Sequence, residues 1–369
     1  MSKPLSGIRI VEFAGLGPTP FTCMMLADMG AEVLRIERRG TTGFGGGDEQ
    51  FDYLNRSRPA IALNLKEEQD FVLAKTLAER ADVVVEGFRP GAMERLHLGP
   101  DDLIAANPRL IYARMTGWGQ TGPLAQKAGH DINYLSMTGG LYLVGPHDGP
   151  PMPPVNVTAN FGGGGMVMVS GILAALVERA TSGRGQIIDA AMVDGASLLL
   201  TQIFSWTRMG RWREGRGGNV LDGSAYFYRC YETVDRQFIA VGALEPQFHD
   251  AFVRGVGLDP ADFGDHLDPT HWTERAARIE PIIRSQTRAQ WVEAFAPVDA
   301  CVTPVLSPEE AIEHPANVAR QVHVTVDGAV QPAPAPRFSR TPAAISGPPT
   351  PPGDAGAIDR LRAWGIEPS

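Results

Sequence analysis

The first half of the chain alternates short apolar runs with segments of helical spacing, and this alternation restricts the possible folds more than any other feature. Residues 8–13 form an apolar run, residues 20–29 have helical spacing, and residues 31–36 return to an apolar run. A strand, a helix and a second strand in this order predict a βαβ unit with parallel strands. The breaker-rich residues 15–18 separate the first strand from the helix.

The same alternation continues further along the chain. Residues 72–80 have helical spacing, and residues 82–86 and 110–114 are apolar runs typical of buried parallel strands. We therefore expect an α/β fold in which a large domain contains a doubly wound parallel sheet. Ligands of such sheets bind beyond the carboxyl ends of the strands, and this places residues 15–18 and 87–89 near one crevice.

The pattern changes after the middle of the chain. Residues 166–176 predict a buried helix that is entered through four glycines, 162–165, and the apolar residues 190–204 predict a segment that leaves the large domain. From residue 226 to residue 243 the apolar period is two, interrupted by a polar turn at Asp235, which predicts a β-hairpin.

These changes predict the domain boundaries. We expect a large domain at residues 1–187 plus 330–369, linkers at 188–221 and 311–329, and a small α+β domain at 222–310. Prolines are dense from residue 332 to residue 352, so the tail should be an extended strap.

Composition limits the classes of function. The formal charge of −9 argues against a general nucleic-acid binder, although local basic clusters can still hold an anionic ligand. The three cysteines lie far apart without CxxC spacing, so we predict neither a disulfide framework nor a zinc site, and we expect a reducing cytoplasm. No uninterrupted apolar run suggests a signal peptide or a membrane span.

Four basic residues, Arg38, Lys66, Arg89 and Arg95, each follow a predicted strand or turn. Each one alone has the alternative interpretation of a solvated surface charge, but as a set at one sheet edge they suit a ligand with several phosphates. Residues 15–18 lack the full GxGxxG pattern of a dinucleotide site.

His130 follows a loop rich in glycine and begins a predicted helix. An imidazole there can donate or accept a proton near neutral pH, although a capping histidine is an equal alternative. The glycines 162–165 can expose N–H groups to an oxyanion or can simply permit close helix packing. Glu245 lies at a strand end before a proline, where a solvated surface carboxylate is the plainer interpretation. The twelve methionines suit either a surface for acyl chains or ordinary core.

Several longer segments carry a family resemblance. They are residues 4–7, 11–12, 26–31, 64–66, 111–117, 129–134, 189–195, 245–248 and 299–305. Through them most of the chain resembles the α-methylacyl-CoA racemases of the CoA-transferase family III superfamily. The resemblance implies an interlocked homodimer, in which each active site lies between the large domain of one subunit and the small domain of the other.

The resemblance also implies a reaction and a substrate. Such enzymes of fatty acid metabolism invert the 2-methyl centre of an acyl-CoA thioester by 1,1-proton transfer through an enolate, without a metal or a redox cofactor, since CoA is part of the substrate. His130 matches the histidine that exchanges the proton on one face, and Glu245 matches an acidic residue associated with it. The implied CoA contacts are Leu16, Arg38, Leu63, Asn64, Leu65, Lys66, Gly87, Phe88, Arg89, Arg95, Gly129, Asp131, Ile132, Asn133 and Tyr134.

Asn160 stands where the family has the aspartate that serves the opposite face. An amide cannot accept the proton, so two-base racemisation should be lowered or abolished. The same change would disable a CoA transferase, which uses an aspartate there as a nucleophile. Three explanations stay open: a substitution introduced to stop turnover, a natural relative with degraded chemistry, or a protein that uses one base. A non-catalytic acyl-CoA-binding protein is the alternative function.

Overall fold

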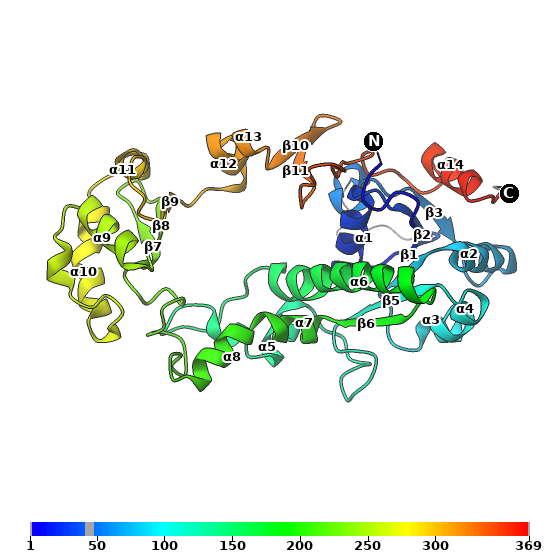
Figure 1. Ribbon diagram of the computed structural model, residues 1–369, viewed down its shortest axis with the longest axis horizontal. Helices are drawn as coiled ribbons and strands as arrows, with labels where there is room; N and C mark the ends of the chain where they lie inside the picture. The colour runs from blue at the N-terminus through cyan, green and yellow to red at the C-terminus, as the bar shows by residue number, and fades with distance from the viewer. Residues whose placement is uncertain (1, 41–47, 368–369) are drawn as a thin grey trace. The chain divides into compact units, whose positions relative to one another are not determined.

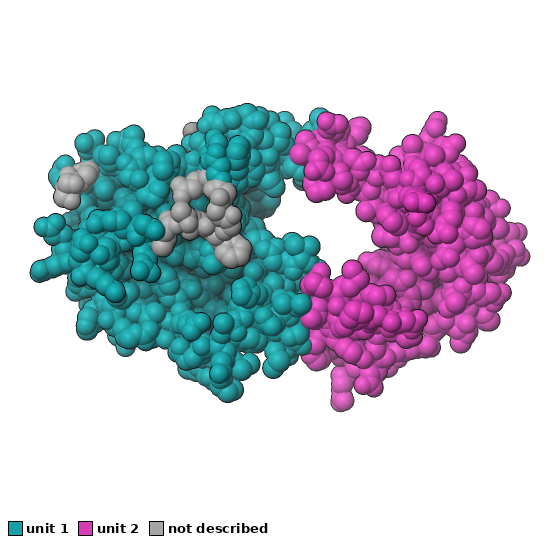
Figure 2. All heavy atoms as spheres, turned by 180° about the vertical axis from the view of Figure 1, so that it is seen from behind, with its two compact units in different colours: residues 1–138, 154–200, 316–369 teal, residues 139–153, 201–315 magenta. Residues whose placement is uncertain are grey.

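The computed structural model describes residues 2–40 and 48–367. The chain forms two compact units, which Figure 2 shows in different colours. Unit 1 comprises residues 1–138, 154–200 and 316–369, and unit 2 comprises residues 139–153 and 201–315.

A six-stranded parallel sheet forms the centre of unit 1 (Figure 1). Its strands are β1 (Arg9–Phe13), β2 (Glu32–Arg38), β3 (Ala60–Leu63), β4 (Val83–Glu86), β5 (Ile111–Thr116) and β6 (Ile187–Ala191). The spatial order is β3-β2-β1-β4-β5-β6, and all neighbours are parallel. The strand order reverses between β1 and β4, so the predicted doubly wound α/β fold is confirmed.

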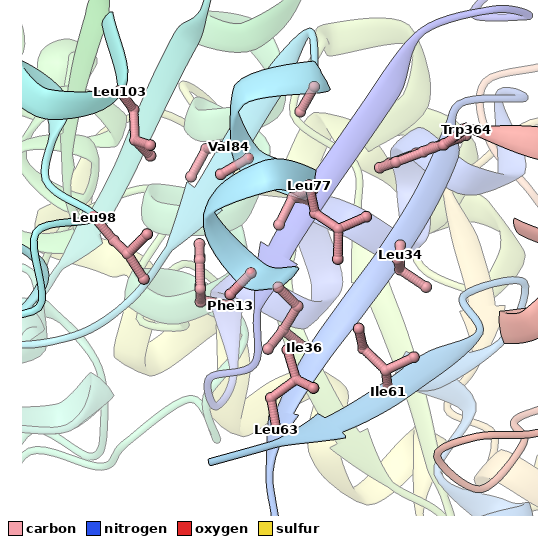
Figure 3. Close-up of a cluster of buried hydrophobic side chains, with 14 of the residues drawn as sticks. Phe13, Leu34, Ile36, Ile61, Leu63, Leu77, Val84, Leu98, Leu103 and Trp364 are labelled. Carbon is pink, nitrogen blue, oxygen red and sulfur yellow. The ribbon is translucent and has the colours of Figure 1, made fainter. Parts of the chain in front are cut away.

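Alternate residues of the strands pack on the helices of one face, as a period of two requires. Phe13, Ile36 and Leu63 point into a buried cluster with Leu77 of helix α2 (Glu68–Arg80) and Trp364 after helix α14 (Ala355–Ala363) (Figure 3). The helices of unit 1 include α1 (Pro18–Asp28), α2 (Glu68–Arg80), α3 (Ala92–Arg95), α4 (Pro100–Ala106), α5 (Asp131–Met137), α6 (Val167–Ser182), α7 (Met192–Leu199) and α14 (Ala355–Ala363). Short turns η1 (Glu49–Phe51) and η2 (Tyr53–Asn55) precede β3.

The glycine run lies inside a helix and not before one. A π-helix, η4 (Val157–Met166), contains all four glycines and continues directly into α6. A Cβ on Gly195 of α7 would lie 1.8 Å from the carbonyl oxygen of Gly163, and a Cβ on Gly163 would lie 2.6 Å from the nitrogen of Ala196. Close packing of η4 on α7 is therefore what these glycines allow. The apolar residues 190–204 likewise are not one segment, because they comprise the end of β6, α7 and part of α8 (Thr201–Arg208).

One helical stretch of the described residues, Val157–Ser182, is long and apolar enough to cross a membrane by length and composition alone. It contacts α1, α7, β5 and β6 within unit 1. A core helix of a folded unit passes the same test of length and composition.

Unit 2 contains an antiparallel sheet of order β7-β8-β9. Strands β7 (Tyr228–Glu232) and β8 (Phe238–Gly242) form the predicted hairpin, which is confirmed, and β9 (Val302–Pro304) pairs with β8. Besides α8, unit 2 contains η3 (Leu141–Leu143), α9 (Pro246–Gly255), η5 (Pro260–Phe263), η6 (Pro269–His271), α10 (Trp272–Ile283), α11 (Arg288–Phe295) and α12 (Pro308–Glu313).

The C-terminal segment returns to unit 1 through α13 (Pro315–Arg320) and the hairpin of β10 (His323–Val326) and β11 (Ala329–Pro332). The described residues 333–354 form neither helix nor strand, so the predicted strap is confirmed. Backbone hydrogen bonds attach the strap to the rest of unit 1; for example, Ala344 N–H donates to Asp28 O at 2.9 Å.

The two units divide the chain differently from the predicted domains, both at residues 139–153 and along the predicted linkers, which group with one unit or the other. Residues 139–153 group with unit 2, because Arg216 donates to the carbonyl oxygens of Tyr142, Pro146 and Gly149. Residues 188–200, predicted as part of a linker, contain the end of the edge strand β6 and the helix α7 of unit 1.

Candidate active site

The parallel sheet brings several predicted ligand-contacting residues to one edge. Leu16 follows β1, Arg38 ends β2, Lys66 follows β3 and Arg89 follows β4. Parallel strands end at the same edge, and this edge contains the reversal of strand order between β1 and β4. The side chains of these four residues and of Arg95 in α3 are exposed.

Other residues predicted to contact a ligand at this edge differ in how accessible their side chains are. The side chain of Leu63 lies in the core, and its carbonyl accepts a hydrogen bond from Arg39 N–H at 3.2 Å. Asn64 and Leu65 are half-buried, and Asn64 Nδ2 donates to Glu67 Oε1 at 2.8 Å. Leu63 can therefore shape the site, while Asn64 and Leu65 remain partly accessible.

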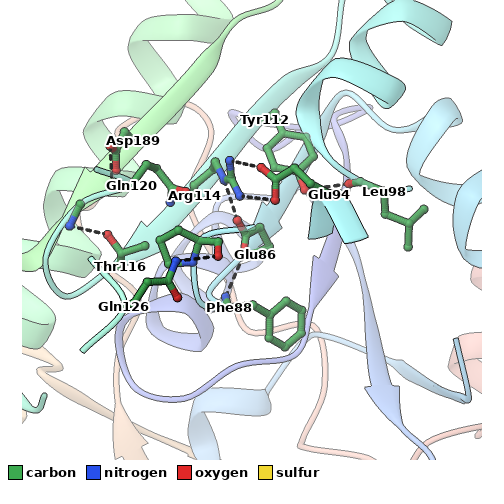
Figure 4. A network of polar contacts seen from close by, with 12 residues as sticks. Glu86, Phe88, Glu94, Leu98, Tyr112, Arg114, Thr116, Gln120, Gln126 and Asp189 are labelled. Atoms are coloured by element: carbon green, nitrogen blue, oxygen red, sulfur yellow. Dashed lines mark hydrogen bonds and ion pairs between the residues drawn. The ribbon is translucent and has the colours of Figure 1, made fainter. Parts of the chain in front are cut away.

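A polar network centred on the buried side chains of Glu86 and Arg114 fixes the loop after β4 (Figure 4). Glu86 accepts from Phe88 N–H at 2.7 Å and from Arg114 Nε at 2.8 Å, and Arg114 also donates to both oxygens of Glu94, at 2.7 and 3.2 Å. Burial raises the pKa of Glu86, and the Arg114 hydrogen bond opposes that rise. The network holds Gly87, Phe88 and Arg89 between β4 and α3.

The sequence patterns above did not predict this network. Its signal was present, because Glu86 and Arg114 are charged residues within apolar strand runs, where burial of a charge requires a partner. Position 87 has no room for a side chain, since a Cβ there would lie 2.6 Å from Thr19 Oγ1.

His130 stands at the N-cap of α5 in extended backbone conformation. Its N–H donates to Asn133 Oδ1 at 3.0 Å, and its carbonyl accepts from Asn133 N–H at 2.8 Å. The imidazole side chain is exposed. Asn133 therefore caps the start of the helix, and the ring of His130 stays accessible to a ligand.

Tyr134 supports the turn before His130. Its hydroxyl donates to Gly129 O, and its ring packs edge-on against the ring of Trp118, with 4.8 Å between the ring centroids. A Cβ on Gly129 would lie 2.8 Å from the Tyr134 ring, and a Cβ on Gly117 would lie 2.2 Å from it. Burial raises the pKa of the Tyr134 hydroxyl. This side chain is a structural support, whereas Ile132 of the same turn is exposed.

Asp131 joins the His130 segment to the Asn160 segment. Its carboxylate is buried, and Oδ2 accepts from the N–H groups of Ala159 and Asn160 at 2.8 and 2.7 Å. One oxygen atom therefore binds the first turn of η4 to the start of α5. The residues predicted to serve the two faces of the substrate are anchored by this contact within unit 1.

Asn160 lies beside the loop after β1, because its Nδ2 is 3.4 Å from the position of a Cβ on Gly17. Its Oδ1 is buried and has no hydrogen-bond partner among the described residues. The side chain is half-buried. The amide can accept or donate a hydrogen bond here but cannot take up a proton.

Glu245 belongs to unit 2, unlike His130 and Asn160. It is the N-cap residue of α9, its carbonyl accepts from His249 N–H at 2.9 Å, and its side chain is exposed. Burial, followed by the charges of Asp299 and then Glu245, raises the pKa of Cys301. An accessible carboxylate at a fixed helix start can contact a ligand or another subunit.

Some methionines lie in the core, and others are exposed and could form a surface for acyl chains. Met115 and Met192 are buried beside Gly164, whereas Met137, Met152 and Met209 are more than half exposed. Among residues 2–40 and 48–367 no group of three or more His, Cys, Asp or Glu residues is arranged to hold a metal ion.

The family profile described as CoA-transferase family III matches residues 5–355. The mouse protein named alpha-methylacyl-CoA racemase is 44% identical over 98% of this chain and 93% of its own length. The human protein of the same name is 41% identical over 92% of this chain and 87% of its own length. An Acetobacter aceti protein named acetyl-CoA:oxalate CoA-transferase is 31% identical over 89% of this chain and 87% of its own length.

Solved structures agree with these matches. The chain superimposes on a CAIB/BAIF family protein from Brucella suis with a TM-score of 0.85 and 25% identity, covering 98% of this chain and all of the other. Fold, family profile and relatives that align over nearly the full length together show that this chain belongs to CoA-transferase family III.

Proposed function

We propose that this chain is an α-methylacyl-CoA racemase scaffold that acts on 2-methylacyl-CoA thioesters. The observation that supports this most directly is the double hydrogen bond of Asp131, which anchors the His130 turn and the Asn160 turn to each other. A reaction that removes a proton from one face and returns it on the other needs two groups on separate segments held in a fixed relation. The higher identity to racemases than to the CoA transferase named above supports the same choice.

The proposed chemistry starts with the weakly acidic α-proton of the thioester. His130, with its accessible ring at a helix start, exchanges that proton on one face. The enolate oxygen gains stabilisation from N–H groups at the start of α5, where the helix dipole favours negative charge. CoA belongs to the substrate, and its phosphates meet the exposed basic residues Arg38, Lys66, Arg89 and Arg95.

Asn160 limits this chemistry. On the opposite face its amide fills nearly the volume of an aspartate, yet it cannot accept or return the proton. We propose that inversion is strongly reduced in this chain while exchange at the His130 face persists. Such a protein incorporates solvent deuterium into one epimer without inverting it.

The assembly and the setting belong to the same proposal. Glu245 is accessible in unit 2, and an interlocked homodimer would bring it from one subunit to His130 of the other. The widely spaced free cysteines support a reducing cytoplasm as the location.

The decisive experiment follows a single epimer of a 2-methylacyl-CoA in D₂O by NMR, with this protein and with its Asn160→Asp variant. We expect both proteins to take up α-deuterium at the His130 face but the variant alone to equalise the epimers efficiently, with inversion at least roughly a hundredfold faster than in the parent chain. Asn156→Asp is the matched control. It adds the same charge at an exposed position four residues earlier, and it should not restore inversion.

Each alternative has its own outcome. Tight thioester binding without α-exchange in any variant supports an acyl-CoA-binding protein and contradicts the racemase. Transfer of CoA to an added carboxylic acid by the Asn160→Asp variant, through a covalent intermediate trapped with hydroxylamine, identifies a CoA transferase.

A further inference from the structure

Unit 2 contains a buried pair of histidines directly beneath the turn that presents Glu245. The rings of His249 and His266 are stacked, with 4.5 Å between their centroids and an interplanar angle of 23°, and both residues are buried. A core position needs no polar ring for packing alone, because phenylalanine fills a similar volume without polar atoms to satisfy. The hydrogen bonds of this pair therefore indicate a more specific role.

His266 bonds the backbone immediately before Glu245. Its Nε2 lies 2.9 Å from the carbonyl oxygen of Leu244. A carbonyl only accepts, so Nε2 is the protonated nitrogen and donates. The next residue, Glu245, is the N-cap of α9, and Pro246 begins the helix. The donor thus restrains the backbone that determines where the Glu245 side chain starts.

The loop that holds His266 is itself attached to α10. Trp272 Nε1 donates to His266 O at 2.8 Å, and Arg275 donates to Asp265 O at 2.7 Å. A continuous set of hydrogen bonds therefore runs from α10 through the loop to Leu244. His266 is the side chain in this set that touches the Glu245 turn.

His249 completes the support from inside α9. Its Nε2 lies 2.7 Å from the Tyr226 hydroxyl and its Nδ1 lies 3.3 Å from Asp250 Oδ1. Burial lowers the pKa of His249, Asp250 opposes this shift, and the charges of His266 and Arg275 add to it. A neutral His249 accepts from Tyr226 and gives His266 an uncharged ring to stack on.

We propose that His266 is a positioning residue for Glu245, acting through the carbonyl of Leu244 and the stack on His249. The inference rests on the proposed function for its catalytic consequence, since Glu245 is there the acidic partner of His130. Its structural part, the restraint on the Leu244–Glu245 backbone, stands independently of that function.

The test compares His266→Phe with His266→Gln in the Asn160→Asp protein. Phenylalanine keeps the ring and removes the donor, whereas the glutamine Nε2 can reproduce the donor. We expect His266→Phe to lower kcat for α-proton exchange roughly tenfold with little change in KM, and His266→Gln to retain most of the activity. His271→Phe is the control, because this nearby histidine has an exposed side chain whose ion pairs are with Asp268 and Glu274, and it should change neither constant.

A double-mutant cycle separates positioning from general stabilisation. If His266 acts through Glu245, His266→Phe causes no further loss of kcat once Glu245→Gln is present, although both backgrounds show the same fall in Tm. An equal tenfold loss in both backgrounds, or a loss no larger than that of His271→Phe, overturns the proposal.

Hydrogen exchange gives a readout that does not depend on activity. The amide of His249 donates to Glu245 O at 2.9 Å, so loosening of the turn should speed its exchange at least roughly tenfold in His266→Phe and little in His266→Gln. If the Asn160→Asp protein has no α-exchange, the proposed function fails while this measurement still decides the restraint. Unchanged protection in His266→Phe contradicts the restraint itself.

Discussion

At the scale of single residues, the site depends on a few polar groups whose partners lie far away in the sequence. Asp131 binds two backbone N–H groups twenty-eight and twenty-nine positions later, and Glu86 and Arg114 form a buried pair across neighbouring strands. Buried polar groups of this kind stabilise only while every partner stays in place. Substitutions should therefore reveal them through stability as well as through activity.

Asp131→Ala should strongly destabilise unit 1. It leaves the N–H groups of Ala159 and Asn160 without an acceptor in a buried site, so we expect the free energy of unfolding to fall by about 2–4 kcal/mol. Asp131→Asn keeps one acceptor oxygen and should lose about 1 kcal/mol. Urea denaturation of both variants measures the difference, and equal losses would show that the double hydrogen bond is not what stabilises this turn.

At the scale of elements, the crossing of η4 and α7 positions Asn160. The two helices approach so closely that the backbone of Gly163 occupies the space of a side chain at Gly195. A bulkier residue would separate the helices and displace the first turn of η4, because packed interiors transmit a change of volume.

Gly195→Ala should therefore destabilise unit 1 by about 2–3 kcal/mol or more, by overpacking. Gly171→Ala in α6 is the matched control. Its Cβ would meet a side-chain carbon of Ile188 at 3.3 Å, so the change should stay within about 1 kcal/mol, and higher helix propensity offsets part of any cost. Thermal unfolding compares the two, and equal midpoints would contradict the close crossing.

At the scale of the whole molecule, charge and assembly matter most. A chain with a formal charge of −9 presents exposed basic side chains at the carboxyl edge of its parallel sheet, and in the proposed function they attract an anionic thioester despite the overall sign. The proposed dimer adds a second property, because it would divide each active site between two subunits.

Complementation tests this division. In the Asn160→Asp background, His130→Ala and Glu245→Ala should each be nearly inactive alone, while the purified doubly tagged mixed dimer of the two should recover roughly one half of the activity. One of the two sites in each mixed dimer is intact. Racemisation by the purified doubly tagged dimer measures the recovery. No recovery in a confirmed mixed dimer would place each site within one chain.

The sequence by itself predicted the parallel sheet, the hairpin of unit 2 and the strap, because their apolar period, breakers and prolines are local signals. It also located the helix start at His130 and the residues that follow the strands. Asn160 needed the family pattern to be noticed, since a single amide has no periodicity. Its consequence for turnover remains a prediction.

Tertiary structure alone decided the rest. The glycines of η4 were ambiguous in sequence because they suit an oxyanion site and a close helix crossing equally, and only the partner backbone of Gly195 shows the crossing. The acceptor role of Asp131, the assignment of residues 139–153 to unit 2 and the support of Glu245 by His266 likewise depend on residues distant in the chain. Local sequence patterns determine which helix or strand forms. The hydrogen-bond partners of buried polar groups and the backbone that packs against a glycine come together only once the chain has folded.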